Sequence, residues 1–137
     1  MNLINHKPSF DKGVLVFRIL SAMALLRAHG LPKLLNFQET LAHIPDPLGL
    51  GSMFSAYYAV FTNVFCAILV ALGLFTRVAA FFIVTLTLSG LFLIHLDDGP
   101  KIQDTPLIYA IVFGFLTYVG AGYYSLDDKL RSKVYEI

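Results

Sequence analysis

The distribution of charged residues along the chain constrains its fold more than any other feature. Asp, Glu, Lys and Arg are absent from residues 47–76, 78–96 and 105–126, which are windows of 30, 19 and 22 residues. About 20 residues of apolar helix are enough to cross the hydrocarbon core of a bilayer. Each window can therefore hold one membrane crossing. A fourth crossing is expected at residues 13–31, although this segment also contains two arginines and a histidine.

The composition excludes an ordinary soluble domain. Hydrophobic residues make up 57% of the 137 residues, charged residues make up 14%, and the mean hydropathy is +0.71. A soluble domain carries about a quarter charged residues, so the apolar surface of this chain must face lipid. The net charge is +1 and the basic residues are scattered, which argues against a nucleic-acid partner. The expected partner of the surface is the lipid bilayer.

Helices are the expected form of these crossings, because lipid offers no hydrogen-bond partner to an open backbone. We predict an all-α fold, an integral membrane four-helix transmembrane bundle that forms a single domain over residues 1–137. The predicted crossings are residues 13–31, 53–75, 78–96 and 106–121.

Local signals set the ends of these helices. Thr105 followed by Pro106 is typical of a helix start, and the glycines at 120 and 122 are typical of a helix end. A tight turn at Thr76-Arg77 makes the second and third helices antiparallel neighbours. A short interfacial helix is expected around residues 37–44.

The loop cations predict the orientation in the membrane. Two of them, Lys33 and Lys101, fall on one side. Six fall on the other side, namely Lys7, Lys12, Arg77, Lys129, Arg131 and Lys133. This bias predicts that the N- and C-termini are cytoplasmic. The lone cysteine, Cys66, cannot form an intrachain disulfide, and we expect it to be a packing residue.

The predicted outer ends of the first and third helices carry the densest titratable groups near the apolar core. These are His29 and Lys33 on the first helix, and His95 followed by two aspartates on the third. Histidine donates, accepts and titrates near neutral pH, so these groups could relay protons or hold a quinone carbonyl. The alternative, that they merely lie at headgroup level, remains open. No metal site is predicted. Haem is disfavoured because no attachment motif is present.

Arg18 and Asn63 are the polar residues predicted deepest in the membrane. Eleven residues of helix place Arg18 and His29 on one stripe, about 20° apart, whereas Arg27 faces the other way. A charge at this depth either faces the bundle interior or extends to the headgroups, and both interpretations remain open. No other crossing contains an acid, so Asn63 is the best polar partner for Arg18. The candidate polar pocket is Arg18, His29, Lys33, Asn63 and His95.

The chain resembles the DoxX-like family of small four-helix membrane proteins. The resemblance rests on short motifs in order, from about Gly13 to Asp127: Arg18, then His29-Gly30-Leu31-Pro32-Lys33, Leu72-Gly73-Leu74-Phe75-Thr76-Arg77, His95, and Gly120-Ala121-Gly122-Tyr123-Tyr124-Ser125-Leu126-Asp127. Family members often carry a glutamate where this chain has Asn63, so a charge that would pair with the arginine or move protons is missing here.

The resemblance implies a redox-associated protein of the bacterial cytoplasmic (inner) membrane. It implies a membrane subunit of a quinone-linked redox system, with an outward-facing polar pocket between the first and third helices and with a redox partner protein or a homo-oligomer. Two alternatives remain open, a non-catalytic scaffold or assembly protein and a carrier of small solutes. The sequence assigns no catalytic residue.

Overall fold

A computed structural model describes residues 7–135, which form helices and no strand. In chain order the elements are α1 (Pro8–Leu25), η1 (Leu26–Gly30), α2 (Leu31–Leu35), α3 (Phe37–His43), α4 (Ser52–Val60), η2 (Phe61–Cys66), α5 (Ala67–Leu72), α6 (Thr76–Ser89), η3 (Gly90–Ile94), α7 (Pro100–Val119) and α8 (Leu126–Tyr135). Each η element is a π-helical turn within a longer helix.

Four helices are long and apolar enough to span a membrane, which confirms the predicted fold class. They are Pro8–Leu35, Ser52–Leu72, Thr76–Ile94 and Pro100–Val119. The short helix expected around residues 37–44 is present as α3.

The first span is longer than predicted at both ends. It begins at Pro8, a good first helical residue, and it continues through Pro32 to Leu35. A proline inside an α-helix clashes with the carbonyl four residues earlier. The π-helical turn η1 lies immediately before Pro32 and widens the backbone there, so the helix continues instead of ending.

The predicted start of the fourth span at Thr105-Pro106 is wrong. The helix α7 begins at Pro100, and Pro106 lies inside it. Pro100, the first residue of α7, is the same kind of start signal six residues earlier. Membrane helices also tolerate an internal proline. Pro106 cannot donate to the carbonyl of Ile102, which therefore loses its helical partner.

The turn between the second and third spans is also displaced from its predicted position. Thr76 and Arg77 form the start of α6, and the turn itself is Gly73 to Phe75. Gly73 adopts φ +72°, in the left-handed region that favours glycine. The fourth span ends as predicted, with Gly120 at φ +86° after Val119. The C-terminal helix α8 was not predicted.

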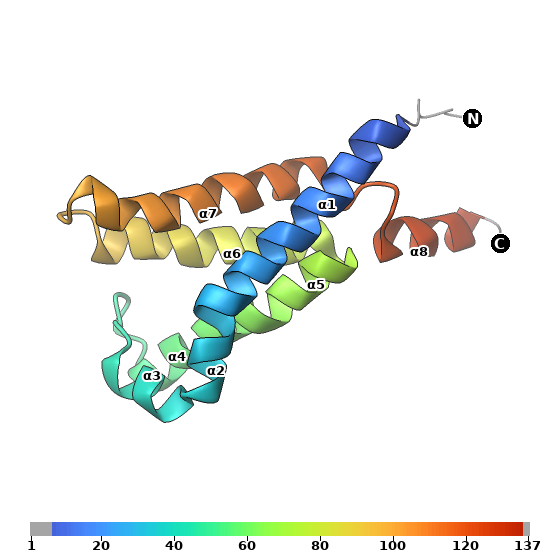
Figure 1. The fold of residues 1–137 in the computed structure, drawn as a ribbon. Helices are drawn as coiled ribbons and strands as arrows, with labels where there is room; N and C mark the ends of the chain where they lie inside the picture. The colour runs from blue at the N-terminus through green and yellow to red at the C-terminus, as the bar shows by residue number, and fades with distance from the viewer. Residues whose placement is uncertain (1–6, 136–137) are drawn as a thin grey trace.

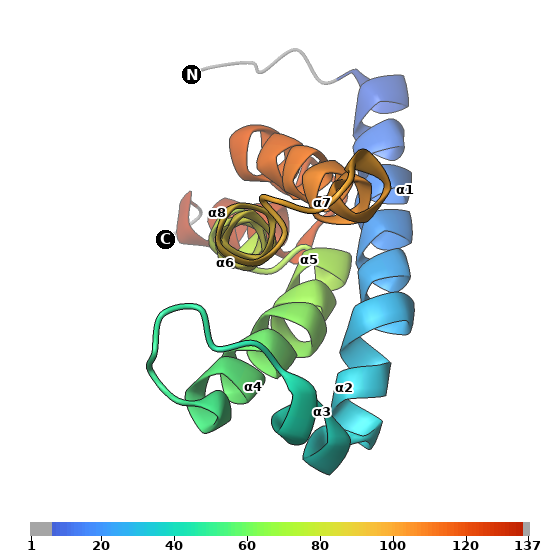
Figure 2. The ribbon, with the colours of Figure 1, turned by 90° about the vertical axis from the view of Figure 1, so that its left-hand side faces the viewer.

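The spans form two antiparallel pairs that diverge. In one pair α6 and α7 lie side by side; in the other α1 packs against α5, and α4 and α5 tilt away from the first pair (Figure 1). The start of α1 and the helix α8 lie at one end of the bundle, which we call the terminal end. The connections between α2 and α4 and between η3 and α7 lie at the other end, which we call the loop end. The second view looks onto this loop end (Figure 2).

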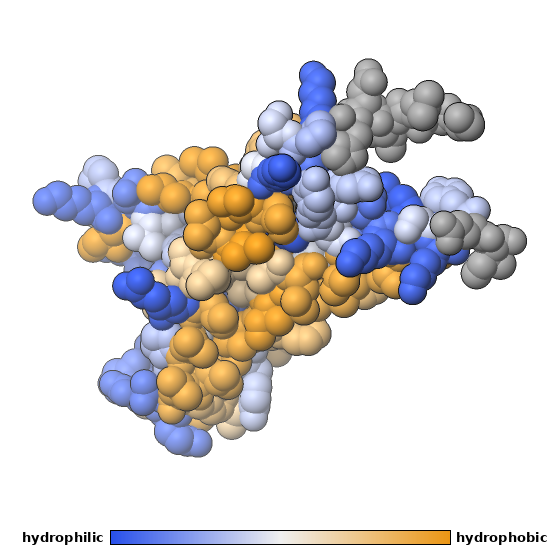
Figure 3. All heavy atoms as spheres, turned by 45° about the vertical axis from the view of Figure 1, so that its right-hand side comes forward, coloured by the Kyte–Doolittle hydropathy of each residue, from blue (hydrophilic) through white to orange (hydrophobic). Residues whose placement is uncertain are grey.

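The outer surface matches a protein surrounded by lipid. Orange, apolar side chains cover the middle of the visible face, and blue, hydrophilic residues gather at its ends (Figure 3). The packed core is made of small and branched residues, including Ala22, Ala80, Ile83, Phe113 and Leu116, each at most 2% exposed. Cys66 is buried in this core, as expected for a packing residue.

Candidate functional site

A cavity of about 690 Å³ occupies the loop end, where the two helix pairs diverge. Its walls come from all four spans and from the connection between α3 and α4. Four of the five residues predicted for the polar pocket line it, namely His29, Lys33, Asn63 and His95. Arg18 does not. The cavity is thus wider than a pocket between the first and third helices.

The three π-helical turns are next to this cavity. His29 lies in η1, Asn63 lies in η2, and His95 directly follows η3. A π-helical turn inserts an extra residue into an α-helix and rotates the side chains that follow it, and such turns are frequent at functional sites. These turns change the direction of the polar side chains in each of the first three spans.

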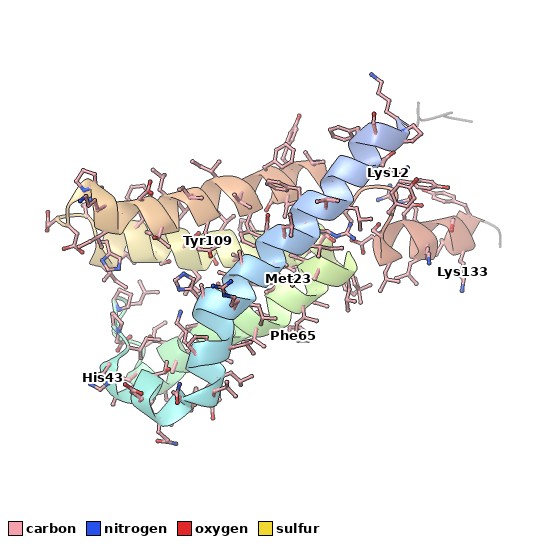
Figure 4. All side chains as sticks on the ribbon, viewed as in Figure 1. Lys12, Met23, His43, Phe65, Tyr109 and Lys133 are labelled. Atoms are coloured by element: carbon pink, nitrogen blue, oxygen red, sulfur yellow. The ribbon has the colours of Figure 1, made fainter. Side chains whose placement is uncertain are left out.

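The first and second spans touch closely at this level. Gly30 packs against Asn63, and a Cβ added to Gly30 would overlap the Asn63 backbone carbonyl oxygen. The glycine therefore allows the two helices to approach. His29, the preceding residue, meets the ring of Tyr109 on α7 edge to face, with ring centroids 5.4 Å apart. Tyr109 is labelled in the side-chain view (Figure 4).

The Asn63 side chain is buried in the wall of this cavity, and its carbonyl oxygen lacks a hydrogen-bond donor within residues 7–135. The residue is 2% exposed, and its Oδ1 accepts no hydrogen bond from the described residues. An unpaired buried polar group costs about 1–3 kcal/mol. Such a group next to a cavity is suited to a ligand or to a water molecule.

His95 is held by its own loop. Its Nδ1 lies 2.6 Å from Asp98 Oδ2, and an ionised carboxylate only accepts hydrogen bonds, so Nδ1 carries the proton. The Gln103 amide donates to the carbonyls of His95, Leu96 and Asp98, each at 2.9 Å. These bonds leave His95 Nε2 to interact with the cavity.

Sequence reasoning missed two tyrosines of the cavity wall. Tyr58 and Tyr109 both line the cavity, although neither is among the residues predicted for the polar pocket. The Tyr58 hydroxyl lies 2.5 Å from Thr85 Oγ1, which itself donates to the Phe82 carbonyl at 2.7 Å. The tyrosine is therefore the donor of this pair. Only the fold brings Tyr58 and Thr85 together, so no local sequence signal could have identified them.

Arg18 lies at the terminal end, where two of its guanidinium nitrogens are hydrogen-bonded within the protein and its buried Nε has no partner among the described residues. It is 2% exposed, which places it in the bundle interior and excludes extension to the headgroups. Its Nη1 donates to the carbonyl of Ala121, and its Nη2 donates to the carbonyl of Tyr124 at 3.0 Å. The expected pairing with Asn63 is wrong, because Asn63 lies at the other end.

The motifs around Arg18 form a structural lock, which we define as Arg18, Gly73, Ala121, Tyr124 and Asp127. Asp127 accepts hydrogen bonds from the backbone N–H groups of Phe75 at 2.7 Å and Thr76 at 3.0 Å, so it caps the start of α6. A Cβ on Gly73 would lie 3.0 Å from Arg18 Cζ. The turn and the C-terminal motif thus hold the terminal end together.

The cavity wall combines a few polar side chains with a mostly apolar lining. Residues 7–135 contain no group of three or more His, Cys, Asp or Glu side chains placed to hold a metal ion. Lys33 and the Asn63 Nδ2 group can donate hydrogen bonds, the Asn63 Oδ1 can accept one, and the two histidines can do either. The remaining wall is mostly apolar, with Leu25, Leu86, Phe54, Ile94 and Ile102 among its members, and suits a hydrocarbon tail.

These features define a helical integral membrane protein with a ligand-sized cavity at one end of its bundle. The sequence matches the DoxX family over residues 13–96, more than half of the chain. The protein therefore belongs to the DoxX family. An uncharacterized protein of Haemophilus influenzae is similar to it, with 27% identity over 143 residues that cover 96% of this chain and 98% of that protein. No solved structure gives a significant match.

Proposed function

We propose that this protein is a membrane subunit of a quinone-linked redox system and that the loop-end cavity holds the quinone head group. The observation that supports this most strongly is the convergence of His29, Asn63 and His95 on one cavity of about 690 Å³. Ligand pockets commonly measure about 300–1,000 Å³ and combine apolar walls with a few placed polar groups.

In this proposal the quinone supplies the electron-accepting chemistry and the chain positions its ring. The Asn63 amide and the His29 ring hydrogen-bond the ring oxygens. His95, held by Asp98 through Nδ1, also lines the cavity and would hydrogen-bond the ligand through Nε2. The loop end faces the outside of a bacterial cytoplasmic membrane, and a redox partner protein or a second copy of the chain completes the system.

The second candidate is a non-catalytic scaffold. The structural lock supports a scaffold role for the terminal end. Every hydrogen bond described for Arg18 and for the Asp127 side chain goes to the chain itself. Under this alternative the polar residues of the loop end would also serve only to hold helices together.

Quinone binding to the purified full-length protein in detergent separates the two candidates. Equilibrium binding of a short-chain alkylquinone is measured for the wild type and for the double variant His29→Ala and His95→Ala. Loss of two hydrogen-bonding groups should weaken binding by at least about tenfold. His43→Ala is the control, because His43 is exposed on α3 and outside the cavity wall. No binding by the wild type, or unchanged binding by the double variant, would exclude the quinone role.

A further inference from the structure

The charges that line the cavity are of one sign. Among the described residues of its wall, Lys33 is basic, two are histidines and none is acidic. The nearby acids are engaged in their own loops. The Asp46 carboxylate accepts from the N–H groups of Leu50 and Gly51 at 3.1 and 2.9 Å, and Asp98 holds His95.

Lys33 differs from the other buried cation of the first span. Arg18 has two backbone carbonyls as acceptors. Lys33 is half-buried in the cavity wall, and its ammonium group makes no hydrogen bond or ion pair with residues 7–135. A charge withdrawn from water is costly unless it is paired. Among the described residues, the cavity wall offers this half-buried charge no acidic counter-ion.

We infer that the cavity takes a head group that carries a negatively charged oxygen and that Lys33 is its counter-ion. This inference rests on the proposed function and narrows its ligand to a quinone ring in an ionised, acidic form. Lys33 lies one helical turn after His29, so the two side chains share a face of the helix. Apolar residues form most of the rest of the wall and hold an uncharged tail.

Two matched probes test this inference on the full chain in detergent. The first is an alkylated hydroxynaphthoquinone, which is ionised at neutral pH, and the second is its methyl ether, which has the same ring and tail without the charge. The wild type should bind the ionised probe about tenfold more tightly, as expected for a charge-assisted hydrogen bond. In Lys33→Gln this preference should disappear, whereas Lys33→Arg should retain it.

Lys101→Gln is the matched control, because Lys101 is an exposed cation at the same end of the bundle but outside the cavity wall; it should keep the full preference. Equal binding of both probes by the wild type overturns the inference and leaves the proposed function standing. A preference that survives in Lys33→Gln overturns the role of Lys33. Binding of neither probe overturns the proposed function itself. The comparison of the two probes on the wild type tests the preference for an anionic ligand even if Lys33→Gln fails to fold. In that case Lys33→Met replaces Lys33→Gln.

Discussion

Two arginines of the first span show how burial determines what a charge does. Arg18 is 2% exposed and bonded to two carbonyls, whereas Arg27, nine residues later, is exposed on the opposite face. The helical offset of about 180° predicts this difference from the sequence. A buried charge that is hydrogen-bonded inside the protein is costly to leave without its partners, whereas an exposed charge contributes little.

Replacing Arg18 should therefore destabilise the protein without removing the cavity. Arg18→Met leaves the Ala121 and Tyr124 carbonyls without a donor, and we expect a loss of about 2–4 kcal/mol in the free energy of unfolding. Thermal unfolding in detergent measures this loss, with Arg27→Met as the control that stays near the wild type. Loss of quinone binding by Arg18→Met at unchanged stability would instead place Arg18 in the binding site.

The sequence predicts the residues of the candidate site better than it predicts their partners. His29, Lys33, Asn63 and His95 could be named because polar groups in apolar segments are rare. The partners of Arg18 could not be named, because they are backbone carbonyls about a hundred residues away. Every residue has a backbone carbonyl, so the residue type does not identify the acceptor. The pairing of Tyr58 with Thr85 depends in the same way on how the spans pack.

At the scale of elements, hydropathy predicts the existence of the spans and turn chemistry predicts some of their ends. The glycine after α7 was correctly predicted to end that helix. Pro32 and Pro106 were predicted to lie at helix ends, but the helices continue through both, because a membrane helix tolerates an internal proline. The helix α8 was missed because it is short and polar. The π-helical turns were not predicted either, because no residue pattern identifies them.

The crossing of the first two spans depends on a glycine at position 30. A methyl group there would meet the Asn63 backbone, which cannot move aside without shifting the helix. Gly30→Ala should therefore cost about 1–3 kcal/mol of unfolding free energy and should also weaken quinone binding, because His29 and Asn63 flank the contact. Gly114→Ala is the control, because a Cβ at that helical position meets nothing within 4 Å. Equal thermal stability of the two variants would contradict the close helix contact.

At the scale of the whole molecule, the two ends of the bundle have different roles. The terminal end is closed by the structural lock, with each Arg18 and Asp127 bond made inside the chain. The loop end holds the cavity, the unpaired Asn63 Oδ1 and the half-buried Lys33. Both ends of the described chain lie at the terminal end (Figure 1), and the loop cations predict that this end is cytoplasmic. The ligand would then enter from the outer half of the membrane.

Photolabelling of membranes that contain the full-length protein tests the central claim most directly. A photoreactive alkylquinone is cross-linked and the labelled peptides are mapped by mass spectrometry. The account predicts labels on the cavity walls, in residues 44–63 and 85–109, which unlabelled quinone should displace. Labels confined to the lipid-facing surface or to the terminal end around Arg18 would contradict it.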